Sequence, residues 1–188
     1  MKPILILSIF LQVFAVIKSQ DLKNFTKASY GNFTIDQFLK TRSKVLPEGY
    51  SRSDIKSKGA IFISFMHLIS ERISIGGCVG STKITSDVIL NNQVVGILNR
   101  YLYTLAFESN LTYIKRHNFQ LYAAAGIGYS LGKDEYSMDT GKKDSGTVGF
   151  MVFHLSPIAF KFGNRLAFFS ELGFGYKGIA NFGISYVL

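Results

Sequence analysis

The chain has 188 residues, 17 Phe, 10 Tyr and 18 Gly, but only 3 Pro and 1 Cys, and its formal net charge is +9. This length suits one domain, and a single cysteine excludes an intramolecular disulfide. The basic residues are dispersed and form no stripe, so the charge does not indicate nucleic-acid binding. It fits attraction to anionic lipid headgroups or lipopolysaccharide phosphates instead.

The N-terminal segment has the layout of a secretory signal peptide. Lys2 gives a positive start, an apolar run extends from Ile4 to Ile17, and Ser19 follows. The run is shorter than the roughly 20 residues that cross a bilayer as a helix, which favours a cleaved signal over a membrane anchor. We therefore predict a signal peptide over residues 1–19, cut after Ser19, and one domain over residues 20–188.

The exported part of the sequence predicts a series of β-strands, because apolar and polar residues alternate with a period of two. The predicted strands lie near residues 26–34, 59–69, 72–83, 100–113, 119–131, 146–162, 166–176 and 180–188. The ranges 35–57, 84–97 and 132–145 are polar and are predicted as long loops, with a helical spacing at 35–45. Pro157 predicts a bulge in its strand, since proline lacks a ladder donor.

The order of the connections indicates a barrel. Long loops and short turns alternate along the chain, and the strand count is even, as in outer-membrane barrels. The fold class predicted is therefore all-β, an eight-stranded antiparallel transmembrane β-barrel preceded by a cleaved signal peptide. Closure requires the last strand, Phe182 to Tyr186, to pair with the first strand near Tyr30.

The two faces of the strands differ in a way that indicates lipid on the outside. One parity is nearly free of charge and carries aromatic residues near the strand ends, as at membrane interfaces. These residues are Tyr101, Tyr113, Phe119, Tyr129, Tyr176 and Tyr186. In the closing hairpin, Leu172, Phe174, Tyr176, Phe182, Ile184 and Tyr186 are predicted to face lipid, and Glu171, Gly173, Gly175 and Asn181 to face inward.

Four polar residues are candidates for the barrel interior: Glu108, Asn110, Lys161 and Glu171. An eight-stranded interior is just wide enough to be filled by side chains, and a carboxylate is costly there unless it is paired. Lys161 is the predicted partner of one of the two glutamates. A filled lumen argues against a general porin.

The last third of the chain resembles small Gram-negative outer-membrane β-barrel proteins of the porin-like family. The matching stretches are Ser156-Pro157-Ile158, then Glu171 to Gly178 with Gly173, Gly175 and Tyr176, then Asn181 to Tyr186 with Gly183. The resemblance implies an outer-membrane location and insertion by the barrel-insertion machinery. The family typically ends in Phe, where this chain has Leu188.

The sequence does not indicate an enzyme, a cofactor or a metal. Gly173, Gly175 and Gly178 have the spacing of a dinucleotide fingerprint, but a strand follows where that motif needs a helix. His67, His117 and His154 lack metal-ligand spacing. We therefore expect an integral outer-membrane protein with a largely filled lumen, serving a structural or surface role or weak passage of small solutes. The alternative is a soluble exported barrel that binds a small apolar ligand.

Overall fold

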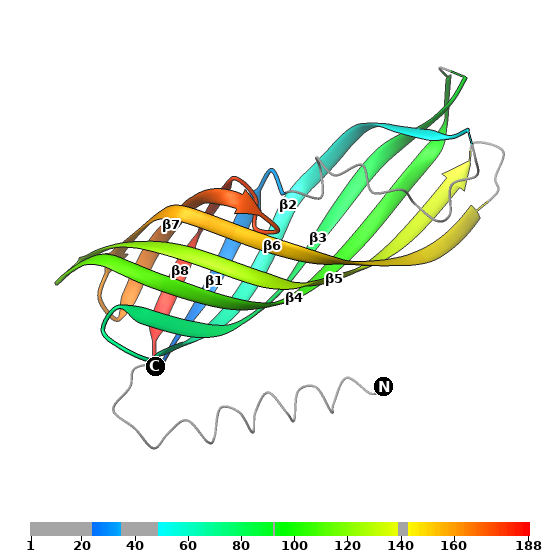
Figure 1. Cartoon of the computed structure of the whole chain (residues 1–188). Helices are drawn as coiled ribbons and strands as arrows, with labels where there is room; N and C mark the ends of the chain where they lie inside the picture. Colours follow the sequence, from blue (N-terminus) through cyan, green and yellow to red (C-terminus); the bar gives the residue numbers. More distant parts are fainter. Residues whose placement is uncertain (1–23, 35–48, 92, 139–142) are drawn as a thin grey trace.

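A computed structural model describes residues 24–34, 49–91, 93–138 and 143–188 and contains eight β-strands (Figure 1). The strands are β1 (Asn24–Asn32), β2 (Ser51–Leu68), β3 (Ile73–Leu90), β4 (Gln93–Arg116), β5 (Phe119–Met138), β6 (Lys143–Gly163), β7 (Leu166–Gly175) and β8 (Ala180–Val187). The predicted signal peptide and the helical spacing at 35–45 lie outside the described residues. No helix in the described ranges is long and apolar enough to cross a membrane.

The eight strands form a closed barrel in which each strand pairs with its neighbours in sequence and β8 pairs with β1. All pairings are antiparallel, and closure places Tyr30 opposite Phe182 and Thr26 opposite Tyr186. The predicted pairing of the first strand with the last is confirmed. A register shift between Leu155 and Ile158 lies at Pro157, where the sequence predicts a bulge.

The strands differ greatly in length, and this shapes the molecule. β1, β7 and β8 have 9, 10 and 8 residues, whereas β2 to β6 have between 18 and 24. The long strands continue beyond the closed barrel as a curved sheet, here called the extension, on the side away from the short turns (Figure 1). The prediction of long loops at 84–97 and 132–145 is therefore wrong, because β3 to β6 run through both ranges, and β2 occupies 51–57 of the first predicted loop.

The outer face of the closed barrel is apolar. The exposed side chains there include Ile61, Ile63, Tyr103, Leu105, Phe107, Ile127, Tyr129, Leu131, Met151, Phe153, Leu155, Leu166, Phe168, Leu172, Phe182 and Ile184. We call this band the outer belt. Lys27, Glu108 and Glu171 point inward and are at most 3% exposed. Apolar outside and polar inside is the arrangement of a transmembrane β-barrel, so the alternative with the apolar parity inward is wrong.

A charge placed in the outer belt tests contact with lipid directly. Leu105 and Val94 both lie on β4 and are 64% and 58% exposed, but only Leu105 lies in the belt. We expect Leu105→Arg to lower the free energy of unfolding in a bilayer by roughly 2–4 kcal/mol and Val94→Arg by roughly 0–1 kcal/mol. Urea unfolding in vesicles measures both. Equal effects would contradict a belt immersed in lipid, since on a water-exposed face both arginines are well solvated.

Candidate functional site

The connection between β7 and β8 folds into the barrel. Gly175 and Gly178 have φ angles of 143° and 95°, which residues with a side chain rarely adopt. The amide of Tyr176 donates to the carbonyl of Phe153 at 3.0 Å, and that of Ile179 donates to Asn32 at 3.0 Å. Tyr176 is 1% exposed. The prediction that Tyr176 faces lipid is wrong, because the backbone at Gly175 ends the alternation one residue before it.

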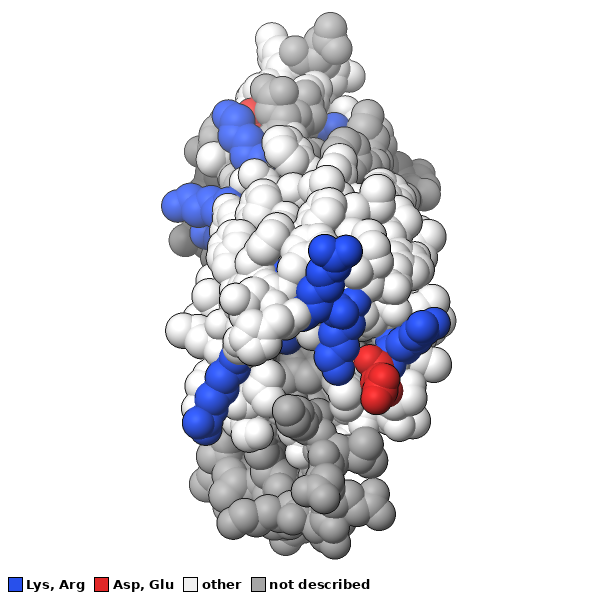
Figure 2. All heavy atoms as spheres, turned by 90° about the vertical axis from the view of Figure 1, so that its left-hand side faces the viewer, with Lys and Arg blue, Asp and Glu red and all other residues white. Residues whose placement is uncertain are grey.

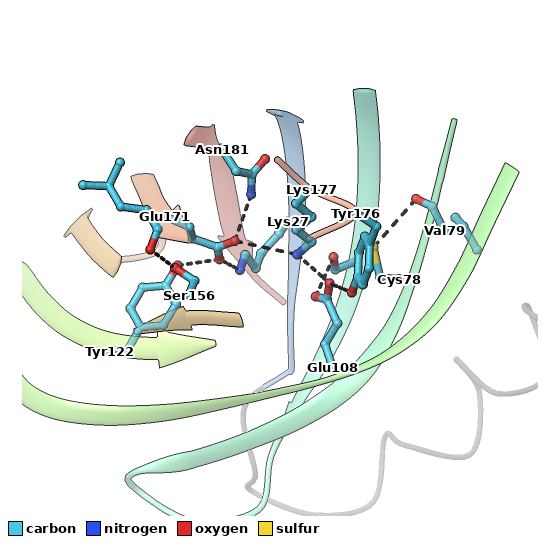
Figure 3. A network of polar contacts seen from close by, with 12 residues as sticks. Lys27, Cys78, Val79, Glu108, Tyr122, Ser156, Glu171, Tyr176, Lys177 and Asn181 are labelled. Carbon is cyan, nitrogen blue, oxygen red and sulfur yellow. Dashed lines mark hydrogen bonds and ion pairs between the residues drawn. The ribbon is translucent and has the colours of Figure 1, made fainter. Parts of the chain in front are cut away.

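The folded-in turn brings a lysine to Glu108 on β4 (Figure 3). Lys177 Nζ lies 2.5 Å from Glu108 Oε1, and the Tyr176 hydroxyl donates to the same oxygen at 2.7 Å. Ser64 Oγ on β2 donates to Glu108 Oε2 at 3.1 Å. Lys177 and Glu108 are 1% and 3% exposed. The carboxylate therefore has partners for both oxygens, as a buried charge requires.

Glu171 on β7 is the second centre of the network. It forms an ion pair with Lys27 of β1 and accepts hydrogen bonds from the Tyr122 hydroxyl at 2.9 Å and from Asn181 Nδ2 at 2.8 Å. Lys177 Nζ lies 3.8 Å from Glu171 Oε2, so this lysine stands between the two glutamates (Figure 3). Two ammonium groups thus face two carboxylates inside the barrel. We call these charged residues and their hydrogen-bond partners the luminal network; its members are Lys27, Ser64, Glu108, Tyr122, Glu171, Tyr176, Lys177 and Asn181.

The luminal network crosses the barrel and links most of its wall. Its residues come from β1, β2, β4, β5, β7, β8 and the β7–β8 turn. Apolar contacts extend it, with Tyr176 packing 5.5 Å from Phe62 and 5.5 Å from His154 between ring centroids. Lys27 also lies 4.4 Å above the Phe169 ring. Every charge in the network thus has an opposite neighbour, so both of its carboxylates are paired.

The four lumen-facing candidates fall into two groups. Glu108 and Glu171 are the centres of the network, whereas Asn110 and Lys161 lie nearer the short turns and are 5% and 9% exposed. The predicted pairing of Lys161 with a glutamate is wrong: Lys27 and Lys177 occupy that role. Lys27 lies on the inward parity of β1, which was a usable signal. No such signal marks Lys177 in the sequence, because a lysine two residues after Gly175 looks like an ordinary turn residue.

The residues that resemble the porin-like motif lie in β6, β7 and β8 and in the β7–β8 turn. A Cβ on Gly173 or Gly183 would meet the backbone of Ser156 or Ser29 at under 3.0 Å, so both glycines permit close strand contact. Tyr186 is 41% exposed on the outer face, under the Arg165 guanidinium at 5.3 Å. The motif therefore marks the walls and turn that hold the luminal network.

A second polar cluster lies on the extension, on the side of β4 that faces inward in the closed barrel. Arg100 of β4 donates to both oxygens of Asp134 of β5, at 2.6 Å and 2.8 Å, and both residues are 1% exposed. Val88, Leu98 and Tyr136 form a small core beside them. Burial, followed by the charge of Arg100, lowers the pKa of Arg52 in the same region. The paired charges and the core give the extension its own packing.

These features define the class of the protein: an eight-stranded transmembrane β-barrel of the outer-membrane type, with an internal ion-pair network. No family model matches the chain, so membership of the porin-like family stays a prediction. No curated protein matches it either. Among solved structures, it is similar to Ail, the attachment invasion locus protein of Yersinia pestis, determined in complex with the heparin analogue sucrose octasulfate. The identity is 11% and the TM-score 0.45, over 88% of this chain and 95% of that one.

Proposed function

We propose that the protein is an integral outer-membrane protein of the cell envelope whose lumen is closed to passive flow at the luminal network. The observation that carries this is the β7–β8 turn, which places Tyr176 and Lys177 inside the barrel at 1% exposure each. An eight-stranded barrel has little interior space to begin with. The protein would therefore act through its surface and its stability in the envelope, with at most weak passage of small solutes.

The rim of the outer belt supports contact with outer-membrane lipid and lipopolysaccharide. On neighbouring strands, Lys83 pairs in register with Tyr101, and Tyr101 with Lys133. Lys83 Nζ lies 5.1 Å from the Tyr101 ring centroid. A hydrogen bond from Lys133 to Glu135, together with the charge of Glu135, raises the pKa of Lys133. Lysines and tyrosines in one row suit phosphate-bearing headgroups at the edge of the hydrocarbon.

The other parts of the proposal concern biogenesis and orientation. Export by a signal peptide over residues 1–19 and insertion by the barrel-insertion machinery agree with the predicted N-terminus and the closed barrel. Short turns face the periplasm in outer-membrane barrels, so the extension would stand outside the cell. We propose no enzymatic activity, because Glu108 and Glu171 are held in ion pairs with Lys27 and Lys177.

Location and pore character can be tested in one series of experiments. We expect the protein in the membrane fraction, with a gel mobility that changes on boiling, and liposomes containing it to swell in a small sugar nearly as slowly as protein-free liposomes. Recovery in the soluble fraction with no heat-dependent mobility would refute the barrel in the membrane. Swelling as fast as with a general porin would instead refute the closed lumen and leave the location intact.

A further inference from the structure

Below the luminal network, the barrel opens toward the short turns as a wide cavity of about 800 Å³. We call it the vestibule. Five lysine and arginine side chains line it, namely Lys27, Lys115, Arg116, Lys161 and Arg165, and Glu71 is the one acidic side chain among the described lining residues. Seen from this end, basic side chains clearly outnumber acidic ones (Figure 2). The vestibule is therefore electropositive.

Lys161 distinguishes the vestibule from a merely basic surface. It is 9% exposed, and the structure gives it no carboxylate partner in the described part of the chain. Its ammonium group lies over the Phe25 ring, 4.8 Å from Nζ to the centroid. Burying an ammonium group without a counter-ion is costly. Because Lys27 is already paired with Glu171, Lys161 is the buried lysine of the vestibule that has no carboxylate partner among the described residues.

Two further buried polar groups line the same cavity. The Oδ1 atom of Asn110 and the Oγ atom of Ser185 have no hydrogen-bond partner among the described residues, and these residues are 5% and 2% exposed. Buried polar side chains normally find partners. The serine hydroxyl can donate, and so can the asparagine amide after a flip of its oxygen and nitrogen. The residues that line the vestibule thus include Lys161 and two side chains with a buried oxygen that has no partner among the described residues.

We propose that the vestibule binds a small phosphate-type oxyanion, with Lys161 as its principal contact. Charge-assisted hydrogen bonds from an ammonium to a phosphate oxygen are short and strong. Lys115, Arg116 and Arg165 at the mouth attract anions and raise their local concentration. The phosphate is either a free ion or ester in solution or the headgroup of an anionic lipid, since the same contacts suit both. Binding here does not depend on whether the lumen is closed.

The test is isothermal titration of the full-length protein in neutral detergent at constant ionic strength. The probes are inorganic phosphate and, separately, short-chain phosphatidylglycerol. We expect saturable binding by the wild type. Lys161→Met should bind the probe with an affinity lower by roughly tenfold or more. Ser185→Ala is expected to weaken it less. Lys56→Met is the matched control, because this lysine is exposed on the part of β2 that belongs to the extension and does not line the vestibule, and it should bind as the wild type does.

A second measurement guards against a variant that merely misfolds. Lys161→Met removes a buried charge that has no carboxylate partner in the described ranges, so without phosphate the thermal midpoint of the variant should rise above that of the wild type. Phosphate should raise the midpoint of the wild type but not of the variant. Lys161-dependent binding of inorganic phosphate identifies a soluble oxyanion, and binding of phosphatidylglycerol alone identifies a lipid headgroup. Absence of saturable binding by both probes, or equal binding by Lys161→Met, overturns the proposal.

Discussion

Replacement of Glu171 by alanine is expected to lower the free energy of unfolding by about 3–5 kcal/mol, the usual cost of removing one member of a buried ion pair. Glu171 is 0% exposed and accepts from Lys27, Tyr122 and Asn181. Its loss leaves the Lys27 ammonium in the lumen without its carboxylate. The Tyr122 hydroxyl and the Asn181 amide lose their acceptor at the same time. Urea unfolding in vesicles, monitored through the heat-dependent gel mobility, gives the free energy of unfolding.

Two further variants separate the charge of Glu171 from its other roles. Glu171→Gln keeps an oxygen that can accept from Tyr122 or Asn181, so its cost should lie between those of the wild type and the alanine variant. Glu135→Gln is the control, since the Glu135–Lys133 pair is exposed at 45% and 58% and should contribute little. If Glu171→Ala unfolds at the same urea concentration as Glu135→Gln, the luminal network does not stabilise the barrel.

The barrel wall could be predicted from the sequence because the membrane imposes a strict alternation. Lipid on one side and a narrow lumen on the other leave each position of a strand only one suitable kind of side chain. Leu105 and Ala106 on β4 illustrate this, at 64% and 5% exposed. Closure followed from the same constraint, since an open sheet edge in lipid would leave backbone groups unpaired. The pairing of Tyr30 with Phe182 could therefore be predicted, although the two residues lie in strands at opposite ends of the barrel sequence.

The extension was missed because charged residues occur on both faces of its strands. Around residues 132–145 both parities carry charge: Lys133 is exposed, while Asp134 is 1% exposed and paired with Arg100. A buried aspartate paired with a residue of another strand looks, in sequence, like one more loop charge. The alternation of Lys133, Asp134, Glu135 and Tyr136 was present, but hydropathy does not reveal it.

The partners inside the lumen could not be predicted for a different reason. Lys27 and Glu171 are 144 positions apart and meet only because β1 and β7 flank β8 in the closed barrel. The parity of a residue within its strand indicates that the residue faces inward. It does not give the position of the residue along the barrel axis or the residue that lies opposite it. Lys161 had suitable parity and the nearer position in sequence, yet it lies lower, in the vestibule. Sequence reasoning thus identified the acids and assigned the wrong base.

The backbone contact between β1 and the β7–β8 turn yields the second large expected effect. A Cβ on Gly31 would lie well under 3.0 Å from the carbonyl of Lys177, and a Cβ on Gly178 would meet the carbonyl of Asn32 in the same way. Backbone atoms cannot rotate aside as a side chain can. Gly31→Ala should therefore push the turn away from its position and separate Lys177 from Glu108 and Glu171.

We expect Gly31→Ala to cost about 3 kcal/mol of unfolding free energy, the upper end of the usual cost of overpacking, and to speed liposome swelling by a small sugar. Gly77→Ala is the matched control, since no atom lies within 4 Å of a Cβ at Gly77. Gly77→Ala should not lower the free energy of unfolding, because alanine also reduces the entropy of the unfolded chain. It should not speed liposome swelling either. A Gly31→Ala variant that is destabilised but swells no faster would mean that the turn braces the barrel without closing its lumen, and equal stability of the two variants would refute both roles.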